Sequence, residues 1–584
     1  MKHIHNYLFL FLILTLISCN PKSTNVGDSN KKEVRLSRFA RNYPDFNPQH
    51  LNEILQQKLS QDSVLSSLYT HNQFAPIWVH DTLDTKKLYT FVSILDNSVE
   101  HGLPKNYFTT DTINKLISAI DLGVYSNLDT LYHRMYELET LSTKAAIQYA
   151  TGMSYGFTNP KKLFGKKDYD ISISTPDSAF YSNLYKLLAE DPIAYIQQAP
   201  PSHPTYQKLL EEYKSLISKE DIDFEKIPSG VTYKLGDKSV HISKIAKRLM
   251  ITGEYTPPAV DSLNTDSLHR ILDENLLAAV NTFRRKNSYP EEKEVGKITI
   301  DALNRPFKYY IERTKANMER YRWRRTKEIH KKHIEVNVAS FSLAATQPDS
   351  LPLIMRVCVG TVGNKTPLLQ SDIAYMNLNP VWNVPKSIAQ GEVAVLQKKD
   401  PTYIKRKNMR LFKGGKEVDP STIDWSEVNP SKFSYLIRQD PGYGNSLGLI
   451  KFMFNNKFSV YLHDTPSKSA FNRKNRAVSH GCVRIQQPFD MAVFLMSPVR
   501  ETYRDEVLYS VKREPETANG KKLAREGKFK KLPDIINMTD KISLIIDYYT
   551  AYMYPGDSDL YYADDVYSYD NVILAAMDSL ALQL

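Results

Sequence analysis

The segment "AVSHGCVRI" at residues 477–485 holds one of only three cysteines in this chain of 584 residues. A cysteine that attacks an acyl carbon needs a base to accept its proton and donors for the charge that develops on the carbonyl oxygen. His463 is a candidate base for Cys482. Gly481 leaves room for backbone N–H groups to approach a substrate, and Arg484 can hold the thiolate or a substrate carboxylate.

His463 can serve Cys482 only if a second element carries it to the same place. In "FSVYLHD", residues 458–464, apolar and polar residues alternate, so Tyr461 and His463 are expected on one face of a strand. At the end of that strand, His463 can hydrogen-bond a partner on the loop that contains Cys482. An adjacent imidazolium lowers the pKa of a thiol, so we expect Cys482 to be a thiolate even at mildly acidic pH.

The residues alone leave three interpretations of Cys482 open. It could be a nucleophile, a small apolar core residue, or a zinc ligand together with His463 and His480. The sequence has no paired C-x-x-C or H-x-x-x-H element, which disfavours zinc, and no metal site is predicted. Cys358, in the apolar run "LIMRVCVG", is expected to be buried in a strand.

The third cysteine ends an export signal. A short basic start is followed by an apolar run from Tyr7 to Ile17, which is too short to span a bilayer. The run ends in "LISC", which resembles the lipobox of bacterial lipoproteins and implies that Cys19 is lipidated and begins the mature chain. We therefore expect an exported cell-envelope lipoprotein held at a membrane by its lipid. Asn20 is not the aspartate that retains enterobacterial lipoproteins at the inner membrane, which favours the periplasmic face of the outer membrane.

The composition indicates folded protein beyond this signal. Hydrophobic residues make up 42% and charged residues 24% of the chain, so most of its length can bury a core. The net charge of +11 is small for this length, and no nucleic-acid-binding fingerprint is present, so no nucleic acid partner is predicted. The basic run "RYRWRR" at residues 320–325 is expected to form a solvated face of a helix.

A change of hydrophobic period divides the chain. Helical spacing extends to about residue 332, and strand alternation begins in "HIEVNVASF". The predicted fold class is multidomain α+β, with a small helical module formed by "VHISKIAKRLMITGEY", "LHRILDENLLAAVNTFRRKN" and "TIDALNRP". The expected segments are a signal peptide (1–19), a flexible tether (20–40), an α-helical scaffold (41–225), the three-helix module (226–310), a connecting helix (311–332), a mainly-β domain (333–550) with an inserted, Trp425-containing cap (about 390–446), and a C-terminal helical segment (551–584).

The segment "YLHDTPSKSAFNRKNRAVSHGCVRI" resembles the active-site signature of the YkuD-type L,D-transpeptidases, in which a histidine shortly precedes an S/T-H-G-C motif. The segments "MRVCVG", "NPVWNVPKSI" and "RQDPGYGNSLGLIKF" occur in the order seen in the large, YcbB-like branch of that family. That branch combines a helical scaffold, a peptidoglycan-binding-like module and a capped β-sandwich catalytic domain. The resemblance covers nearly all of the mature chain.

The resemblance implies a role for each residue of the motif. It makes Cys482 the nucleophile and His463 the general base, with a backbone carbonyl orienting the imidazole, so that Asp464 has no assigned role. The resemblance also implies that five residues support the acyl site: Ser479, His480, Gly481, Tyr461 and Arg484. In the helical module, Arg284 stands where the family has a glutamine, which leaves glycan binding and a spacer role equally open.

The resemblance also implies the reaction. Cys482 would attack the carbonyl of the third residue of a peptidoglycan stem peptide and expel the fourth, and a side-chain amine of a second stem would accept the acyl group in a 3→3 crosslink. No metal or organic cofactor is expected. Water as acceptor would give an L,D-carboxypeptidase, and a protein amine would give a wall-anchoring enzyme. A non-catalytic, wall-binding lipoprotein is the alternative from a different class.

Overall fold

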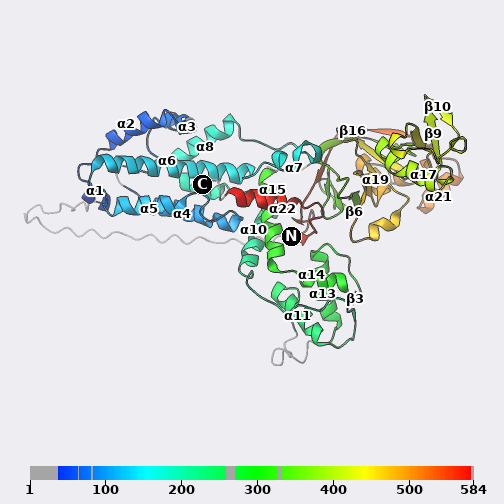
Figure 1. Cartoon of the computed structure of the whole chain (residues 1–584), viewed down its shortest axis with the longest axis horizontal. Coiled ribbons are helices and arrows are strands. Elements are labelled where there is room, and N and C mark those ends of the chain that lie inside the picture. Colours follow the sequence, from blue (N-terminus) through cyan, green and yellow to red (C-terminus); the bar gives the residue numbers. More distant parts are fainter. Residues whose placement is uncertain (1–36, 63–64, 81–82, 258–269, 325–330, 581–584) are drawn as a thin grey trace, which may run out of the picture.

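The computed structural model describes residues 37–580 apart from residues 63–64, 81–82, 258–269 and 325–330. The lipobox, Cys19 and nearly all of the expected tether lie outside the described residues. Figure 1 shows an elongated molecule, with helices at one end, a β-rich body at the other and a small helical module below their junction. No helix in the described part of the chain combines the length and apolarity needed to cross a membrane.

Ten helices and a 3₁₀ turn build the scaffold within the described residues, and their longest member, α6, is its central element. Asn127 caps the start of α6, and Gly156, at φ 92°, ends it. The elements are α1 (Arg38–Asn42), α2 (Pro48–Leu59), α3 (Leu65–His71), α4 (Thr85–Asp96), η1 (Asn97–His101), α5 (Thr110–Asp121), α6 (Leu128–Tyr155), α7 (Pro160–Asp168), α8 (Ser178–Glu190), α9 (Pro192–Gln198) and α10 (Pro204–Ile217).

The three-helix module has its own apolar core. It consists of β2 (Tyr233–Lys234), α11 (Val240–Thr252), α13 (Glu274–Lys286), β3 (Glu294–Val295) and α14 (Lys297–Leu303). Arg284 is buried, donates to the carbonyl of Pro290 at 2.7 Å and pairs with Glu292 at 2.8 Å. Its guanidinium therefore holds the module together and is not presented to a ligand.

Helix α15 (Phe307–Trp323) begins before the connecting helix expected at 311–332, and it is a core element and not a connector. The expected solvated face of "RYRWRR" is wrong, because Arg320 and Arg322 are both buried. Arg320 pairs with Asp570 at 2.6 Å, and Arg322 pairs with Glu319 at 3.0 Å. A buried guanidinium needs such a partner to offset its lost hydration.

The β-rich body is a mixed sheet whose hydrogen-bonded path closes on itself and so forms a barrel. The path runs β7, β12, β13, β15, β6, β5, β4, β16, and β16 pairs again with β7. Its strands are β4 (His333–Asn337), β5 (Ser342–Thr346), β6 (Leu353–Gly360), β7 (Leu368–Leu378), β12 (Ile450–Phe454), β13 (Leu462–His463), β14 (Ala477–Ser479), β15 (Val483–Ile485) and β16 (Ile535–Asp547), with η6 (Lys468–Asn472), α19 (Pro488–Met496), α20 (Tyr503–Ser510) and α21 (Ala518–Arg525) around them. The scaffold adds β1 (Tyr169–Asp170) beside β7. The predicted multidomain α+β class, with a mainly-β domain, is confirmed.

The insert is a small subdomain with its own core and four-stranded sheet. Its sheet includes Trp382, so it begins before the expected residue 390. Trp425 packs inside this core and donates from its indole to the carbonyl of Pro420 at 2.8 Å. The elements are β8 (Trp382–Asn383), α16 (Lys386–Ile388), the π-helical turn η3 (Ala389–Val393), α17 (Ala394–Lys399), α18 (Tyr403–Arg406), β9 (Met409–Lys413), β10 (Lys416–Val418), η4 (Pro420–Thr422), η5 (Pro430–Lys432) and β11 (Leu436–Gln439).

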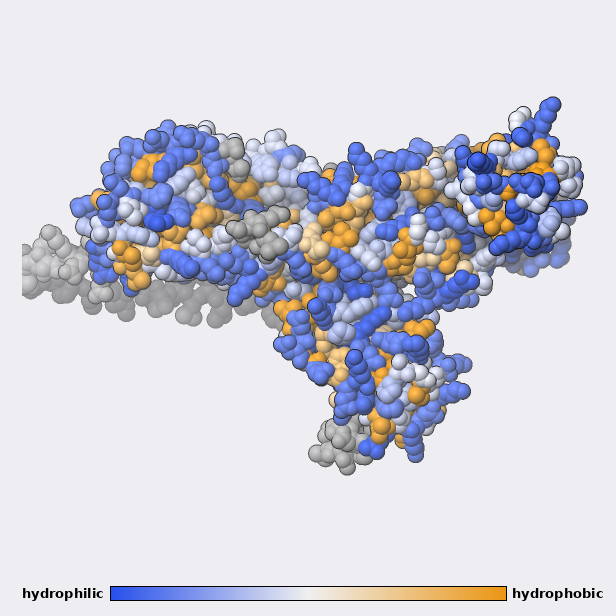
Figure 2. All heavy atoms as spheres, viewed as in Figure 1, coloured by the Kyte–Doolittle hydropathy of each residue, from blue (hydrophilic) through white to orange (hydrophobic). Residues whose placement is uncertain are grey.

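The C-terminal segment leaves the barrel and returns to the scaffold. Its first half forms β17 (Ala551–Tyr552) and β18 (Tyr561–Tyr562), so the expectation of a wholly helical segment at 551–584 is wrong there. Helix α22 (Tyr569–Ser579) lies beside α15 in Figure 1, and its Ile573 and Met577 belong to the scaffold core. Figure 2 shows hydrophilic side chains over most of this face of the molecule, with apolar residues in small groups.

Candidate active site

Three neighbouring strands bring the chemistry-bearing residues together. In register, Lys451 of β12 lies opposite His463 of β13, and His463 lies opposite Arg484 of β15. Leu462 and Val483, next in line, are buried in the barrel core. Because side chains alternate along a strand, Lys451, His463 and Arg484 form a row on the other face of the sheet.

Cys482 lies on the same face, one step before Val483. The backbone N–H of Val483 donates to the carbonyl of Tyr461 at 3.1 Å, which places Tyr461 beside Cys482 and makes His463 their diagonal neighbour. The ring centroids of Tyr461 and His463 are 5.7 Å apart, as their predicted shared face requires. Strand β13 is only two residues long, because Ser459 takes φ 58° and breaks the extended run.

These side chains line a cleft of about 510 Å³ between the barrel and the cap. Six of the seven predicted site residues line it: Tyr461, His463, Ser479, His480, Cys482 and Arg484. Gly481 lies in the loop behind them. The cap contributes Trp382, Ile388 and Glu392 to the opposite wall. The cleft therefore has both a candidate nucleophile and a candidate base, and a wall that the cap supplies.

His463 is held in the tautomer that a base requires. Its Nδ1 lies 2.5 Å from the carbonyl oxygen of Asp464, which can only accept, so Nδ1 carries the proton and Nε2 keeps its lone pair. Burial and the Arg484 cation lower the pKa of His463 to about 3, which keeps the ring neutral. The Asp464 carboxylate instead accepts from the Leu449 N–H at 2.9 Å and from Lys468 at 2.5 Å. A backbone carbonyl thus orients the ring, as the resemblance implies.

The expectation that an imidazolium keeps Cys482 as a thiolate is wrong for the free protein. Burial raises the pKa of Cys482, and His463 is neutral. The groups that lower the pKa of this thiol are hydrogen bonds from the backbone N–H and hydroxyl of Tyr461 and the charges of Lys451 and Arg484. Free Cys482 is therefore a thiol, and an attack by its sulfur would need a base such as His463 to take the proton.

The loop before the nucleophile is fixed by hydrogen bonds. Ser479 Oγ donates to the carbonyl of Cys482 at 2.6 Å and accepts from the N–H of Gly481 at 3.1 Å. Gly481 has φ 113°, a conformation that favours glycine. Thr366 Oγ1 donates to the Gly481 carbonyl at 2.8 Å. Ser479 and Gly481 therefore shape the loop, and the Ser479 hydroxyl is already engaged.

His480 points away from the thiol toward the cap. Its Nε2 lies 3.4 Å from the Glu392 carboxylate of η3. His480 thus connects the nucleophile loop to the cap.

In the part of the chain that the structure describes, no group of three or more histidine, cysteine and acidic side chains could hold a metal ion.

Two residues of the site were missed by the sequence analysis. Lys451 sits in the apolar run "GLIKFMF", where alternation alone gives it an ordinary outward position. Thr366 is more than a hundred residues from Gly481, its partner. Only the strand register brings Lys451 to the cleft, and only the tertiary fold brings Thr366 to the loop behind it, so no local signal could have found them.

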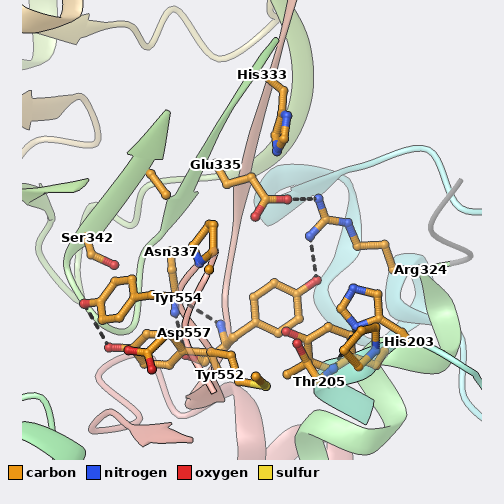
Figure 3. A pocket seen from close by; sticks show the side chains of 17 residues that line it. His203, Thr205, Arg324, His333, Glu335, Asn337, Ser342, Tyr552, Tyr554 and Asp557 are labelled. Atoms are coloured by element: carbon orange, nitrogen blue, oxygen red, sulfur yellow. Dashed lines mark hydrogen bonds and ion pairs between the residues drawn. The ribbon is translucent and has the colours of Figure 1, made fainter. Parts of the chain in front are cut away.

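A second cavity, of about 470 Å³, lies where α10 and α15 meet the outside of β4 and β5 (Figure 3). Its charged groups are paired with each other, because Arg324 bonds Glu335 at 2.6 Å and the hydroxyl of Tyr549 at 3.1 Å. His203 stacks on Tyr321 at 5.2 Å. Ser342 also lines this cavity, and its hydroxyl is hydrogen-bonded to that of Ser340 at 2.6 Å. The cavity lies at the joint between scaffold and barrel.

Comparison with protein families shows which family the barrel resembles. Residues 331–500 match the family described as the L,D-transpeptidase catalytic domain, and this range contains both His463 and Cys482. The barrel is an L,D-transpeptidase catalytic domain of the YkuD type. Residues 63–212 match a family described as a scaffold domain, which is consistent with the YcbB-like branch.

Two known proteins are similar to parts of this chain. A Haemophilus influenzae protein provisionally named an L,D-transpeptidase is 38% identical over 182 residues, which are 31% of this chain and 37% of the relative. The chain thus spans little more than a third of the length of that curated relative. A solved L,D-transpeptidase from Xylanimonas cellulosilytica aligns with 56% of this chain and 100% of its own, at 11% identity and a TM-score of 0.16, which is too low to support an argument.

Proposed function

We propose that this chain is a cysteine acyltransferase that forms 3→3 crosslinks between peptidoglycan stem peptides. One observation carries the proposal. A partly buried cysteine and a neutral histidine whose Nδ1 is held by a backbone carbonyl lie as diagonal neighbours in a cleft of an L,D-transpeptidase domain. A thiol needs such a base, because only the thiolate is nucleophilic.

In the first half-reaction, His463 Nε2 takes the Cys482 proton as Sγ attacks the carbonyl carbon of the third stem residue. The Lys451 and Arg484 cations stabilise the thiolate as it forms. The bond from that carbon to the amine of the fourth residue, D-alanine, then breaks, and the imidazolium returns its proton to the leaving amine. The product is a thioester on Cys482.

In the second half-reaction, an amine of another stem replaces Sγ. His463, again neutral, removes a proton from the attacking amine, and the proton returns to the sulfur as the thioester bond breaks. The steps use only protein groups and the two stems. Water as acceptor would release a tripeptide by the same steps, and a protein amine would anchor that protein to the wall.

We further propose export and anchoring by a lipid on Cys19, which would hold the enzyme at the periplasmic face of the outer membrane. The support is the sequence "LISC" after an apolar core. Fatty acid labelling should mark the wild-type protein and not Cys19→Ala. Label on the variant would exclude the lipoprotein.

The proposed reaction is tested by mass spectrometry of products from purified protein and muropeptides with tetrapeptide stems. Crosslinked dimers that have lost one D-alanine are expected, and Cys482→Ala should make none. Tripeptides alone would establish a carboxypeptidase. Products from Cys482→Ala equal to those of the wild type would overturn the nucleophile, and binding without any product would leave a wall-binding protein.

A further inference from the structure

Lys451 occupies the catalytic cleft next to the base. It faces His463 directly across β12 and β13, and its ammonium lies 3.8 Å from the ring centroid of Tyr461. Tyr461 in turn contacts Cys482. Lys451 is therefore placed among the reacting groups and not at the rim of the cleft.

No carboxylate neutralises Lys451. Among the residues that the structure describes, its ammonium makes no ion pair and no hydrogen bond, and it lies over the ring of Tyr461. Arg484, on the other side of His463, has a buried Nε without a partner. Glu392, the acidic residue that lines this cleft, lies beside His480. Two cations thus flank the base and have no partner there.

Such a pair of cations favours an anionic ligand. Desolvation lowers the pKa of Lys451, which means that its positive charge is held in the cleft at a cost. A carboxylate placed between Lys451 and Arg484 would reverse that cost, because opposite charges attract most strongly where water is excluded.

The reaction brings a carboxylate to this place. His463 must protonate the amine of the departing residue, and the carboxylate of that amino acid is only two bonds away from the amine nitrogen. A group that flanks His463 can therefore reach the carboxylate of the departing residue. We propose that Lys451, together with Arg484, binds the terminal carboxylate of the departing residue and thereby selects donor stems with a free C-terminus.

This inference rests on the proposed function and makes Lys451 a specificity-determining residue. It is tested with two donors, a tetrapeptide stem that ends in D-alanine and the same stem that ends in D-alaninamide. In the wild type, kcat/KM should be about 10-fold or more higher for the free acid than for the amide, because a charge-assisted hydrogen bond contributes a free energy of that size. Lys451→Met should lose most of that preference, and Lys451→Arg should keep most of it.

A matched control is Lys541→Met, which removes an exposed lysine of the same barrel that pairs with Asp372. It should leave the preference unchanged. If Lys451→Met lowers kcat/KM equally for both donors, the proposal is overturned. It is overturned too if the preference survives while the pH midpoint of Cys482 alkylation rises, because Lys451 would then serve the thiolate alone.

Binding without reaction separates this proposal from the proposed function. In the Cys482→Ala background, calorimetry should show tighter binding of the free acid than of the amide, and Lys451→Met should abolish the difference. This result together with an inactive wild type would reject acyl transfer but keep carboxylate recognition. Equal binding of both donors together with an active wild type would reject carboxylate recognition alone.

Discussion

The hydroxyl of Thr366 donates a 2.8 Å hydrogen bond to the carbonyl oxygen of Gly481, directly before the proposed nucleophile Cys482. The Thr366 hydroxyl oxygen also accepts a hydrogen bond from the N–H of Gly360 at 2.8 Å. Tyr567, from the C-terminal segment, donates to the Gly360 carbonyl at 2.6 Å and accepts from the Thr366 N–H at 3.1 Å. The nucleophile loop is thus held from behind by residues far away in the chain.

Thr366→Val should slow acylation with little change in KM. The change keeps the shape of the side chain but leaves the buried Gly481 carbonyl unsatisfied, at a cost of about 1–3 kcal/mol. We expect kcat to fall by about 10-fold, and Thr366→Ser, which keeps the hydroxyl, to restore most of it. The measurement is the rate of acyl-adduct formation. Equal rates for the valine and serine variants would show that the hydroxyl does not position the loop.

Alkylation of Cys482 should accelerate with pH beyond the ordinary cysteine range. Burial raises the pKa of this thiol, so the reactive thiolate forms only in alkaline solution. The rate of iodoacetamide modification, followed by peptide mass spectrometry, should keep rising above pH 8.5, the usual thiol midpoint. Cys358, which is fully buried, serves as the internal control and should stay unmodified. A plateau below pH 7 would instead establish a preformed thiolate.

Asp570→Ala should destabilise the joint between α22 and α15. Asp570 pairs with buried Arg320 at 2.6 Å and accepts from Thr550 at 2.6 Å. Removing one partner of a buried pair leaves an uncompensated charge and costs about 3–5 kcal/mol. The control is Asp578→Ala, which removes an exposed partner of Lys315 and should cost under about 1 kcal/mol. Thermal unfolding measures both, and equal losses would show that the buried pair adds nothing.

The sequence predicted those features that depend on local patterns. Helical spacing gave the α-helical scaffold, whose longest helix is α6. Alternation gave β4 and the shared face of Tyr461 and His463. The S-H-G-C motif gave the nucleophile loop. Each of these features is determined by neighbours a few residues away.

The remaining features depend on contacts between distant segments. The run "RYRWRR" has the composition of a solvated face, but the return of α22 buries Arg320 against Asp570. The prediction that Cys482 is a thiolate was wrong because the sequence does not show how deeply the cap and barrel enclose His463. Lys451 lies at the site because strand register places it opposite His463, and a single sequence does not specify that register.

Acidification should weaken the scaffold through His101. Burial and the nearby Arg322 and Lys214 cations lower the pKa of His101 to about 3, against about 6.5 when unfolded. Because the folded pKa is depressed, the contribution is complete above pH 6.5 and is lost as the pH falls toward 3. At pH 5 the loss is about 2 kcal/mol.

Thermal unfolding of the wild type and His101→Gln at pH 7 and pH 5 tests this loss. The variant should show a smaller drop of Tm between the two values, since glutamine does not titrate. The ring of His101 also contacts the hydroxyl of Tyr206 at 2.8 Å, so the variant should be less stable at pH 7. Parallel drops of Tm in both proteins would assign the acid sensitivity to other groups.

Disrupting the core of the cap should shift the products from crosslinks to hydrolysis. Trp425 is buried in that core, and replacing a buried tryptophan with alanine costs about 3–5 kcal/mol, enough to loosen a small subdomain. The cap forms one wall of the cleft through Ile388 and Glu392, so loosening it admits water to the thioester. We expect Trp425→Ala to raise the ratio of tripeptide to crosslinked dimer, while Trp425→Phe, which keeps an aromatic ring in the core, changes it little. Glu392→Gln removes the charge that faces His480 and leaves the core intact, so it should have a smaller effect in the same direction. An unchanged ratio in Trp425→Ala, with the cap shown to be loosened by proteolysis, would mean that the cap does not protect the acyl-enzyme.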